Sequence, residues 1–163
     1  MKSRCKVLII CVVLALAAGT LLFFLTQKNL TLVLVEQESR HVLKTRTISE
    51  GDQLSFHWIH SFEHIPWIEE YTIQAEQSFM LNTIKVAGFG AGIPENKGIV
   101  TVRDGMVVMS SLEQEFDKIS WIHSQTALVS ITVQGNTFIQ GIDIPHHTPV
   151  ELYLKGTRTL WPR

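Results

Sequence analysis

The sequence predicts an all-β domain, an antiparallel β-sandwich or barrel, preceded by one N-terminal transmembrane helix. The β-domain is predicted by short alternating or apolar runs that turn residues separate, which is the pattern of antiparallel sandwiches and barrels. The helix is predicted by an uncharged apolar segment at residues 7–25, long enough to span a bilayer. Two parts follow, an anchor with its cytoplasmic tip at residues 1–27 and an extracytoplasmic domain at residues 28–163.

The charges around the apolar segment predict its orientation. Only Lys28 follows it closely, whereas three basic residues precede it, Lys2, Arg4 and Lys6. The N-terminus is therefore expected in the cytoplasm and the domain outside it, in a single-pass protein of the cell membrane. Cleavage as a signal peptide is the alternative, because Ala15-Leu16-Ala17 has the small-x-small form. An uncleaved signal anchor is favoured, since cleavage there would leave the apolar residues 21–25 on the mature chain.

Composition excludes several classes of function. Both cysteines, Cys5 and Cys11, lie in or before the anchor, so the exported domain has neither an internal disulfide nor a thiolate site. Taking the three basic residues before the anchor from the fourteen in the chain leaves eleven, against fifteen acidic residues, a formal net charge of −4. A mildly acidic domain disfavours binding to nucleic acid. No cofactor is expected.

Each strand is predicted from its own apolar or alternating run, and the turns from their residue pairs. Asp104-Gly105 suits a type I′ turn and Gly135-Asn136 a type II′ turn, each between two strands. Residues 110–120 are expected to form one short helical turn, because Ser111 precedes a run with helical spacing. The predicted strands are residues 30–36, 40–48, 53–60, 67–75, 79–87, 98–103, 106–110, 127–134, 137–141 and 150–154.

The candidate site lies in two segments, residues 60–70 and 88–94. On an extended strand adjacent residues face opposite sides, so one of Glu69 and Glu70 is expected to face inward, with His60 or Arg103 as its partner. The glycines of the second segment permit positive backbone angles or the close approach of the first segment, a ligand or a partner. The predicted polar cluster, either ligand-binding or structural, consists of His60, Ser61, Glu63, Pro66, Glu69, Glu70, Gly90, Gly92 and Pro94.

Other kinds of site lack part of their motif. His57, His60 and His64 would share a face only on a helix, whereas Pro66 and the aromatic composition favour a strand, so no metal site is expected. A hydrolase centred on Ser61 would need a glycine-flanked nucleophile turn, which is absent. No catalytic residue is predicted, and a metal-dependent or hydrolytic enzyme is the least favoured function.

The two segments resemble the motifs of a known family. His60-Ser61-x-Glu63-x-x-Pro66 leading to Glu69-Glu70, and then Gly90-Ala91-Gly92-Ile93-Pro94, is similar to the bacterial and archaeal domain-of-unknown-function family 1850. The resemblance covers residues 30–154. It implies a small exported or anchored protein, often encoded beside tripartite ATP-independent periplasmic (TRAP) transporters of the TAXI type, and it supplies no catalytic residue. Residues larger than is common in the family, Phe62, Ile65 and Trp67, imply a differently shaped pocket.

The favoured function is an accessory or ligand-binding module of a TRAP/TAXI-type solute transporter. In this interpretation residues 7–25 hold the protein in the bilayer, and the polar cluster meets a small solute. The alternative is a purely structural interaction protein that stabilises membrane-protein subunits. Only the first interpretation predicts that a solute stabilises the domain against unfolding.

Overall fold

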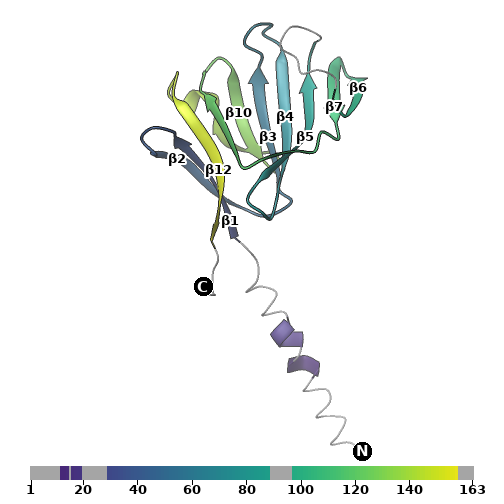
Figure 1. Cartoon of the computed structure of the whole chain (residues 1–163), viewed down its shortest axis with the longest axis vertical. Coiled ribbons are helices and arrows are strands. Elements are labelled where there is room, and N and C mark those ends of the chain that lie inside the picture. The colour runs from purple at the N-terminus through teal and green to yellow at the C-terminus, as the bar shows by residue number, and fades with distance from the viewer. Residues whose placement is uncertain (1–11, 15, 20–28, 89–96, 158–163) are drawn as a thin grey trace, which may run out of the picture.

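The computed structural model describes residues 12–14, 16–19, 29–88 and 97–157. In this part of the chain twelve strands form two sheets, and all paired strands are antiparallel (Figure 1). The predicted all-β class and antiparallel pairing are therefore confirmed.

The smaller sheet has the strand order β2-β1-β12-β9. In β1, alternate residues Leu30, Leu32 and Leu34 are at most 1% exposed, and the two-residue period of a strand places them on one face. Leu152 of β12, which pairs with Leu34, extends this apolar face. The strands of this sheet are β1 (Asn29–Glu36), β2 (Val42–Ile48), β9 (Lys118–Ile122) and β12 (Pro149–Thr157).

The larger sheet has the order β11-β10-β3-β4-β5-β7-β6, and β8 also pairs with β5. A short 3₁₀-helix, η1 (Gly141–Asp143), follows β11. The strands are β3 (Gln53–Ile59), β4 (Pro66–Ile73), β5 (Phe79–Val86), β6 (Ile99–Arg103), β7 (Met106–Ser110), β8 (Gln114–Phe116), β10 (Leu128–Val133) and β11 (Asn136–Gln140).

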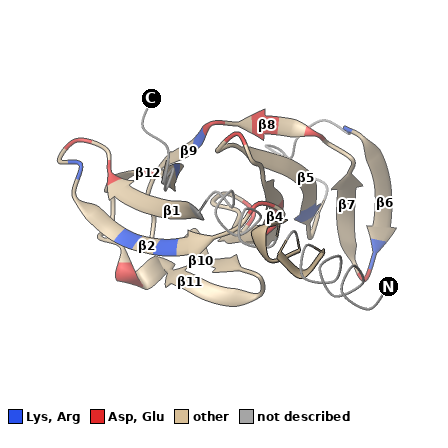
Figure 2. Ribbon diagram, turned by 90° about the horizontal axis from the view of Figure 1, so that it is seen from below, with Lys and Arg blue, Asp and Glu red and all other residues tan. Residues whose placement is uncertain are grey.

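The two sheets approach each other along both edges of the smaller one (Figure 2). On one side β2 lies beside β11, where the Arg46 side chain donates to the Asn136 carbonyl over 3.4 Å. On the other side only Asp117 separates β8 from β9. β6 and β7 extend beyond this closed part of the sandwich (Figure 2).

The core fills the space between the facing sheets. Phe56 of β3 and Ile131 of β10 are fully buried, as is Val86 of β5. Burying each such side chain stabilises the fold by about 1.5–3 kcal/mol relative to exposure. Buried apolar side chains therefore hold the inner face of β3 and β4 in place, and the candidate site lies on this same face.

The predicted strands all correspond to observed strands, with ends that differ by a few residues. The short helical turn predicted at 110–120 is wrong, because this stretch contains β8 and β9. Ser111 and Glu113 have positive φ angles, 56° and 48°, which a right-handed helix does not allow. Ile119 and Trp121 point toward the core, and β9 pairs with β12. The alternation in Lys118–Ile122 was the signal for this strand.

One of the two predicted hairpin turns is confirmed and the other is shifted by one residue. Asp104 and Gly105 both have positive φ, 51° and 77°, as a type I′ turn requires. The β10–β11 hairpin turns at Gln134 and Gly135, with φ of 51° and 71°. The type II′ turn at Gly135-Asn136 is therefore wrong, since Asn136 already belongs to β11 and pairs with Val133.

Within the described residues, the structure contains no helix of the length and apolarity that crossing a membrane requires. Of the anchor predicted at 7–25, residues 12–14 and 16–19 are α-helical, and the remainder lies outside the described residues.

Candidate functional site

The candidate site begins at the hairpin that joins β3 to β4. The His60 N–H donates to the Ile65 carbonyl over 2.8 Å, and the His64 N–H donates to the His60 carbonyl over 2.9 Å. His64 has a φ of 56°, which allows the chain to reverse before Pro66 starts β4. This hairpin lies at the opposite end of the domain from the start of β1 and the end of β12 (Figure 1).

The His60 ring takes part in the same loop. Its Nδ1 accepts the Glu63 N–H over 3.3 Å, so the neutral ring carries its proton on Nε2. The ring also stacks on Trp67, with 5.7 Å between centroids and 13° between planes. The predicted cluster member Glu63 thus contributes its backbone to the position of His60.

The register of the hairpin brings aromatic side chains around Glu69. Trp58 pairs with Trp67, and Phe56 pairs with Glu69, so these four residues share the inner face of the sheet. Tyr71 follows on the same face and is 4% exposed. The inward glutamate is therefore Glu69, in a stretch of sheet lined by indole, phenyl and phenol rings.

Three neutral groups donate hydrogen bonds to the Glu69 carboxylate. Trp67 Nε1 donates to Oε1 over 3.2 Å. Trp58 Nε1 and Tyr71 Oη donate to Oε2 over 3.3 and 3.1 Å. None of these donors carries a charge. The partners differ from the predicted ones, His60 and Arg103, because the hairpin register supplies donors from the same face.

Burial is the dominant influence on the ionisation of this group. It raises the pKa of the Glu69 carboxyl, while the hydrogen bonds from Tyr71, Trp58 and Trp67 oppose the rise. Burial and the adjacent carboxylate also raise the pKa of the Tyr71 phenol far above its usual value, so Tyr71 stays a donor at any physiological pH. The site therefore holds a carboxyl group whose charge no cationic side chain among the described residues neutralises.

A cavity of about 260 Å³ opens beside this carboxyl group. Its wall includes an aromatic stack that continues into the core, since Trp58 lies parallel to Phe56 at 5.5 Å and edge-on to Trp121 of the smaller sheet at 5.9 Å. The residues that line the cavity are Trp58, Ile59, His60, Ser61, Trp67, Glu69 and Ala127. This volume lies below the usual range for drug-sized ligands, so the cavity suits a small molecule.

The predicted cluster is only partly assembled at this cavity. His60, Ser61 and Glu69 line it. Glu70 lies on the other face of β4 and pairs with Lys85, at 2.5 Å. A Cβ added at Gly88 would lie 2.8 Å from Ile65 Cδ1, so the first glycine of the second segment packs against the hairpin loop. Gly90, Gly92 and Pro94 lie outside the described residues.

His57 and His64, which would share a face with His60 only on a helix, do not line the cavity. No group of three His, Cys, Asp or Glu side chains in the described parts of the chain could hold a metal ion. His57 pairs with Ile68 on the outer face of the sheet, and so points away from Trp58 and Trp67. His64 lies in the hairpin turn itself.

The predicted cluster lacks four of the residues that line the cavity, Trp58, Ile59, Trp67 and Ala127. The alternation along β4 separates Glu69 from Glu70, but it does not align β4 with β3. A tight loop between Ile59 and Pro66 fixes that alignment and pairs Trp58 with Trp67. Ala127 is held beside β3 by its carbonyl, which accepts the Ile59 N–H over 2.7 Å. No pattern local to residue 127 indicates this contact.

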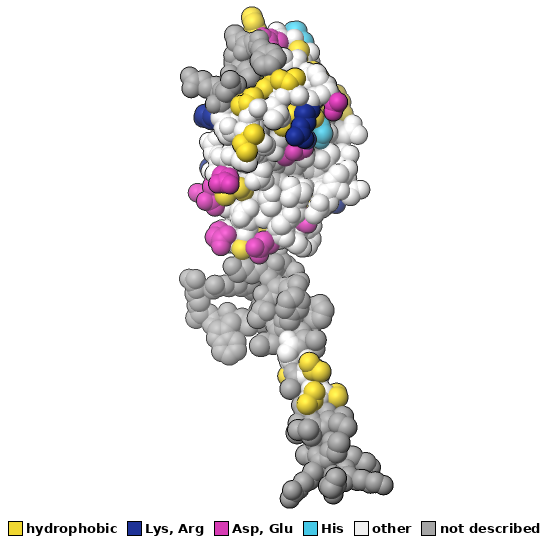
Figure 3. Space-filling view, turned by 90° about the vertical axis from the view of Figure 1, so that its right-hand side faces the viewer, with side chains coloured by type: hydrophobic (Ala, Val, Ile, Leu, Met, Phe, Trp, Pro, Cys, Tyr) yellow, Lys and Arg dark blue, Asp and Glu magenta, His cyan; other side chains and the backbone are white. Residues whose placement is uncertain are grey.

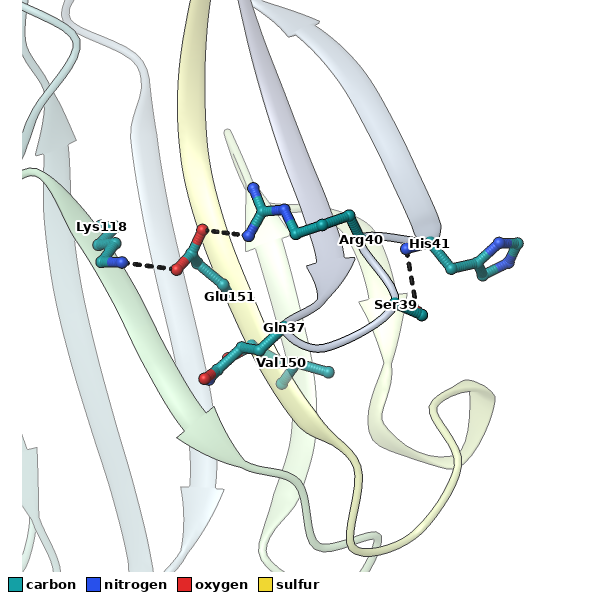
Figure 4. Close-up of polar contacts among 7 residues, drawn as sticks. All are labelled: Gln37, Ser39, Arg40, His41, Lys118, Val150 and Glu151. Atoms are coloured by element: carbon teal, nitrogen blue, oxygen red, sulfur yellow. Dashed lines mark hydrogen bonds and ion pairs between the residues drawn. The ribbon is translucent and has the colours of Figure 1, made fainter.

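A second buried carboxylate lies on the outer face of the smaller sheet (Figure 4). Glu151 of β12 is 8% exposed and pairs with Arg40 Nη1 at 2.9 Å and with Lys118 Nζ at 2.7 Å. The hydrogen bonds from these two cations lower the pKa of the Glu151 carboxyl. Arg40 also lies over the Tyr153 ring at 5.6 Å. This cluster fastens the β1–β2 turn and β9 to β12.

Comparison with known proteins identifies a family without an assigned activity. Comparisons with curated proteins and with solved structures gave no match. The sequence model of a family described as a domain of unknown function, DUF1850, matches residues 54–139. The matched segment begins in β3 and ends in β11, within residues 30–154, over which the motifs resemble the family. It contains every residue that lines the cavity. Because the match covers more than half of the 163 residues, the chain belongs to the DUF1850 family.

Proposed function

We propose that this protein is a small-solute binding module that works beside a solute transporter outside the cytoplasm. The observation that carries the proposal is the cavity at Trp58, Trp67 and Glu69, where a partly buried carboxyl group and aromatic rings border a small open volume. A few fixed polar groups within a largely apolar wall are typical of small-molecule sites. The fold supports the site through Phe56, which packs under Trp58.

The transporter context follows from the resemblance and the apolar N-terminal segment. A membrane anchor at residues 7–25 would keep the domain near the bilayer with its N-terminus in the cytoplasm, and a TRAP transporter of the TAXI type is the proposed partner. The β3–β4 hairpin, which supplies most of the residues that line the cavity, lies at the end of the domain remote from the start of β1, to which that anchor would connect (Figure 1). The site would then face away from the bilayer, where a dissolved solute can enter.

Solute-dependent stabilisation tests the binding function. A ligand that binds only the folded state raises the midpoint of thermal unfolding with concentration, and 100 times Kd corresponds to about 2.7 kcal/mol. The full-length protein is screened against a panel of cationic, anionic and neutral solutes. We expect one class to raise the midpoint, and Trp67→Ala to abolish that rise. A panel without any stabilising solute overturns the proposal.

Transport measurements test the accessory role separately. His60→Ala removes a ring that lines the cavity, so it is expected to lower transporter activity per folded molecule while changing the unfolding midpoint little. Glu63→Ala keeps the backbone N–H that positions His60, so a loss of transport in this variant would assign a role to the carboxylate itself. His57→Ala, on the outer face of β3, is the matched control. If His60→Ala and Glu63→Ala lower only thermal stability and leave transport normal, these residues are structural.

One observation favours the second candidate, an interaction protein that stabilises membrane subunits. β6 pairs with β7 alone among the described residues and is at the edge of the larger sheet. Ile99 and Val102 on it are 60% and 63% exposed. Figure 3 views the molecule from the side on which β6 and β7 lie, and it shows apolar side chains gathered on the upper part of the domain. Exposed edges of this kind accept a further strand or an apolar partner.

Co-purification with transporter subunits distinguishes the two candidates. Val102→Lys puts a charge on the open edge and should block the interaction, but not solute binding. If Val102→Lys leaves co-purification unchanged, the β6 edge is not the contact.

A further inference from the structure

The charge of Glu69 has no protein partner in the described residues. The ion pairs among the described residues join Arg40 and Lys118 to Glu151, and Lys85 to Glu70, so none of them includes Glu69. The three donors that hold the Glu69 carboxylate are neutral indoles and a phenol. Buried charges in proteins are normally paired or coordinated, because removing them from water is costly. An ionised Glu69 therefore favours an external cation.

The carboxylate also retains capacity for another donor. Its two oxygens offer about four acceptor sites, of which the three hydrogen bonds occupy three. Among the described residues, Oε1 accepts only the Trp67 N–H. Because Glu69 lines the cavity, a ligand there can donate to the remaining site.

The other walls suit the carbon atoms around such a cation. Trp58 and Trp67 both line the cavity, and the His60 ring stacks on Trp67. Aromatic faces attract a cation through their quadrupole, tryptophan most strongly. The indole N–H groups point to the carboxylate, which orients both rings before a ligand arrives. Aromatic walls around a carboxylate are a typical arrangement for recognising substituted ammonium groups.

We propose that the cavity binds a small organic cation, a primary or alkylated ammonium, whose charge pairs with Glu69 and whose carbon atoms lie against Trp58 and Trp67. This inference rests on the proposed binding function and names its ligand class. The main competing class is a neutral sugar, which can also stack on tryptophan and donate to a carboxylate.

A matched pair of probes isolates the role of the charge. Choline and 3,3-dimethylbutan-1-ol have the same shape, but only choline is a cation. Binding to the full-length protein is followed by calorimetry and by tryptophan fluorescence, with glucose as the neutral polar probe. We expect choline to bind at least about tenfold more tightly than its neutral isostere, a difference of about 1.4 kcal/mol. Equal binding of the two, or binding of glucose alone, overturns the inference.

Variants test the residue assignment. Glu69→Gln should weaken choline binding about tenfold and remove the preference over the neutral isostere. Glu70→Gln, the adjacent residue on the other face, should leave both unchanged. Ala127→Leu keeps every donor to Glu69 and narrows the cavity, so it should also weaken choline binding if Glu69→Gln proves poorly folded. Unchanged choline binding in a folded Glu69→Gln protein, or in Ala127→Leu, overturns the assignment.

The outcomes also separate this inference from the function on which it rests. If no cation binds but a neutral or anionic solute does, and Trp67→Ala removes that binding, the binding module stands and the cation inference fails. If no probe of any charge binds, both fail.

Discussion

Glu69 and Glu151 are both largely buried carboxylates on β-strands, yet their surroundings are electrostatically opposite. Glu69 lies on the inner face of the larger sheet and accepts hydrogen bonds from three neutral donors. Glu151 lies on the outer face of the smaller sheet between Arg40 and Lys118. Accordingly the pKa of Glu69 is raised and that of Glu151 is lowered.

The difference separates a structural carboxylate from a candidate binding group. The charge of Glu151 is neutralised by the protein itself, so its role is complete when the chain folds. The charge of Glu69 is stabilised by three neutral hydrogen-bond donors, and within the part of the chain that the structure describes no cation neutralises it. A cavity adjoins this carboxylate. Burial alone therefore does not indicate function; the nature of the partners does.

Removing the support beneath Glu69 should have the largest effect. Phe56 is fully buried, pairs with Glu69 across the hairpin and contacts Trp58, Tyr71 and Trp121. Phe56→Ala should lower the free energy of unfolding by about 3–5 kcal/mol, because it leaves a cavity where these rings meet. Denaturant unfolding measures the loss. Phe62→Ala, 76% exposed in the same hairpin, is the control and should change stability by no more than about 0.5 kcal/mol. Similar midpoints for the two variants would show that the Glu69 site is not built on the core.

Tyr71→Phe removes one donor and keeps the ring. The bond from Tyr71 lowers the Glu69 pKa, so its loss should raise that pKa further. A hydrogen bond to a charged group contributes about 1.5–3 kcal/mol, and we expect a loss in this range where Glu69 is ionised and a smaller loss at acidic pH. Stability measured across pH tests this. Tyr153→Phe, beside Arg40 on the outer face, is the matched control. A loss that does not vary with pH would mean that Tyr71 acts through packing alone.

The two carboxylates should give pH dependences of opposite sign. The pKa of Glu151 is lowered, so its stabilisation is present above the unfolded value of about 4.3 and is lost as pH falls through the folded value. The pKa of Glu69 is raised, so its contribution is present below about 4.3 and is lost as pH rises through the folded value.

Replacing each glutamate by glutamine, its neutral isostere, reveals the sign of its contribution to the pH dependence of stability. Glu151→Gln should cost about 1 kcal/mol at pH 7, since exposed partners weaken an ion pair, and the cost should vanish in acid. Glu69→Gln should gain stability relative to the wild type as pH rises. Unfolding free energies from pH 3 to pH 8 test both. Parallel curves for the two variants would remove the electrostatic distinction between the sites.

The sequence predicts the parts of this comparison that depend on local pattern. Strand parity separates Glu69 from Glu70 and requires one of them to face inward, and the structure agrees. Parity does not say which glutamate is inward or what binds it, because both depend on how β4 aligns with β3. The alignment is fixed by hydrogen bonds inside the hairpin loop, between His60 and Ile65.

Contacts between segments that are far apart in the chain could not be predicted from the sequence, for a different reason. Glu151 meets Arg40 and Lys118 because β12 lies between β1 and β9, an order that no local pattern specifies. Trp121 reaches Trp58 from the opposite sheet in the same way. The helical turn predicted at residues 110–120 is wrong because Ser111 and Glu113 have positive φ angles. The chain there continues as β8 and then β9, which carries Trp121.

The smallest expected effect concerns Glu70, whose position one residue from Glu69 makes it the sharpest test of parity. Glu70 and Lys85 form an ion pair with both side chains 33% exposed. Glu70→Gln should cost no more than about 1 kcal/mol, because a solvated ion pair gains little over hydration, and the cost should shrink at high salt. Denaturant unfolding at low and high ionic strength measures both. A substantially larger, salt-insensitive loss would place Glu70 in a buried network like that of Glu69, and the contrast between the two faces of β4 would then disappear.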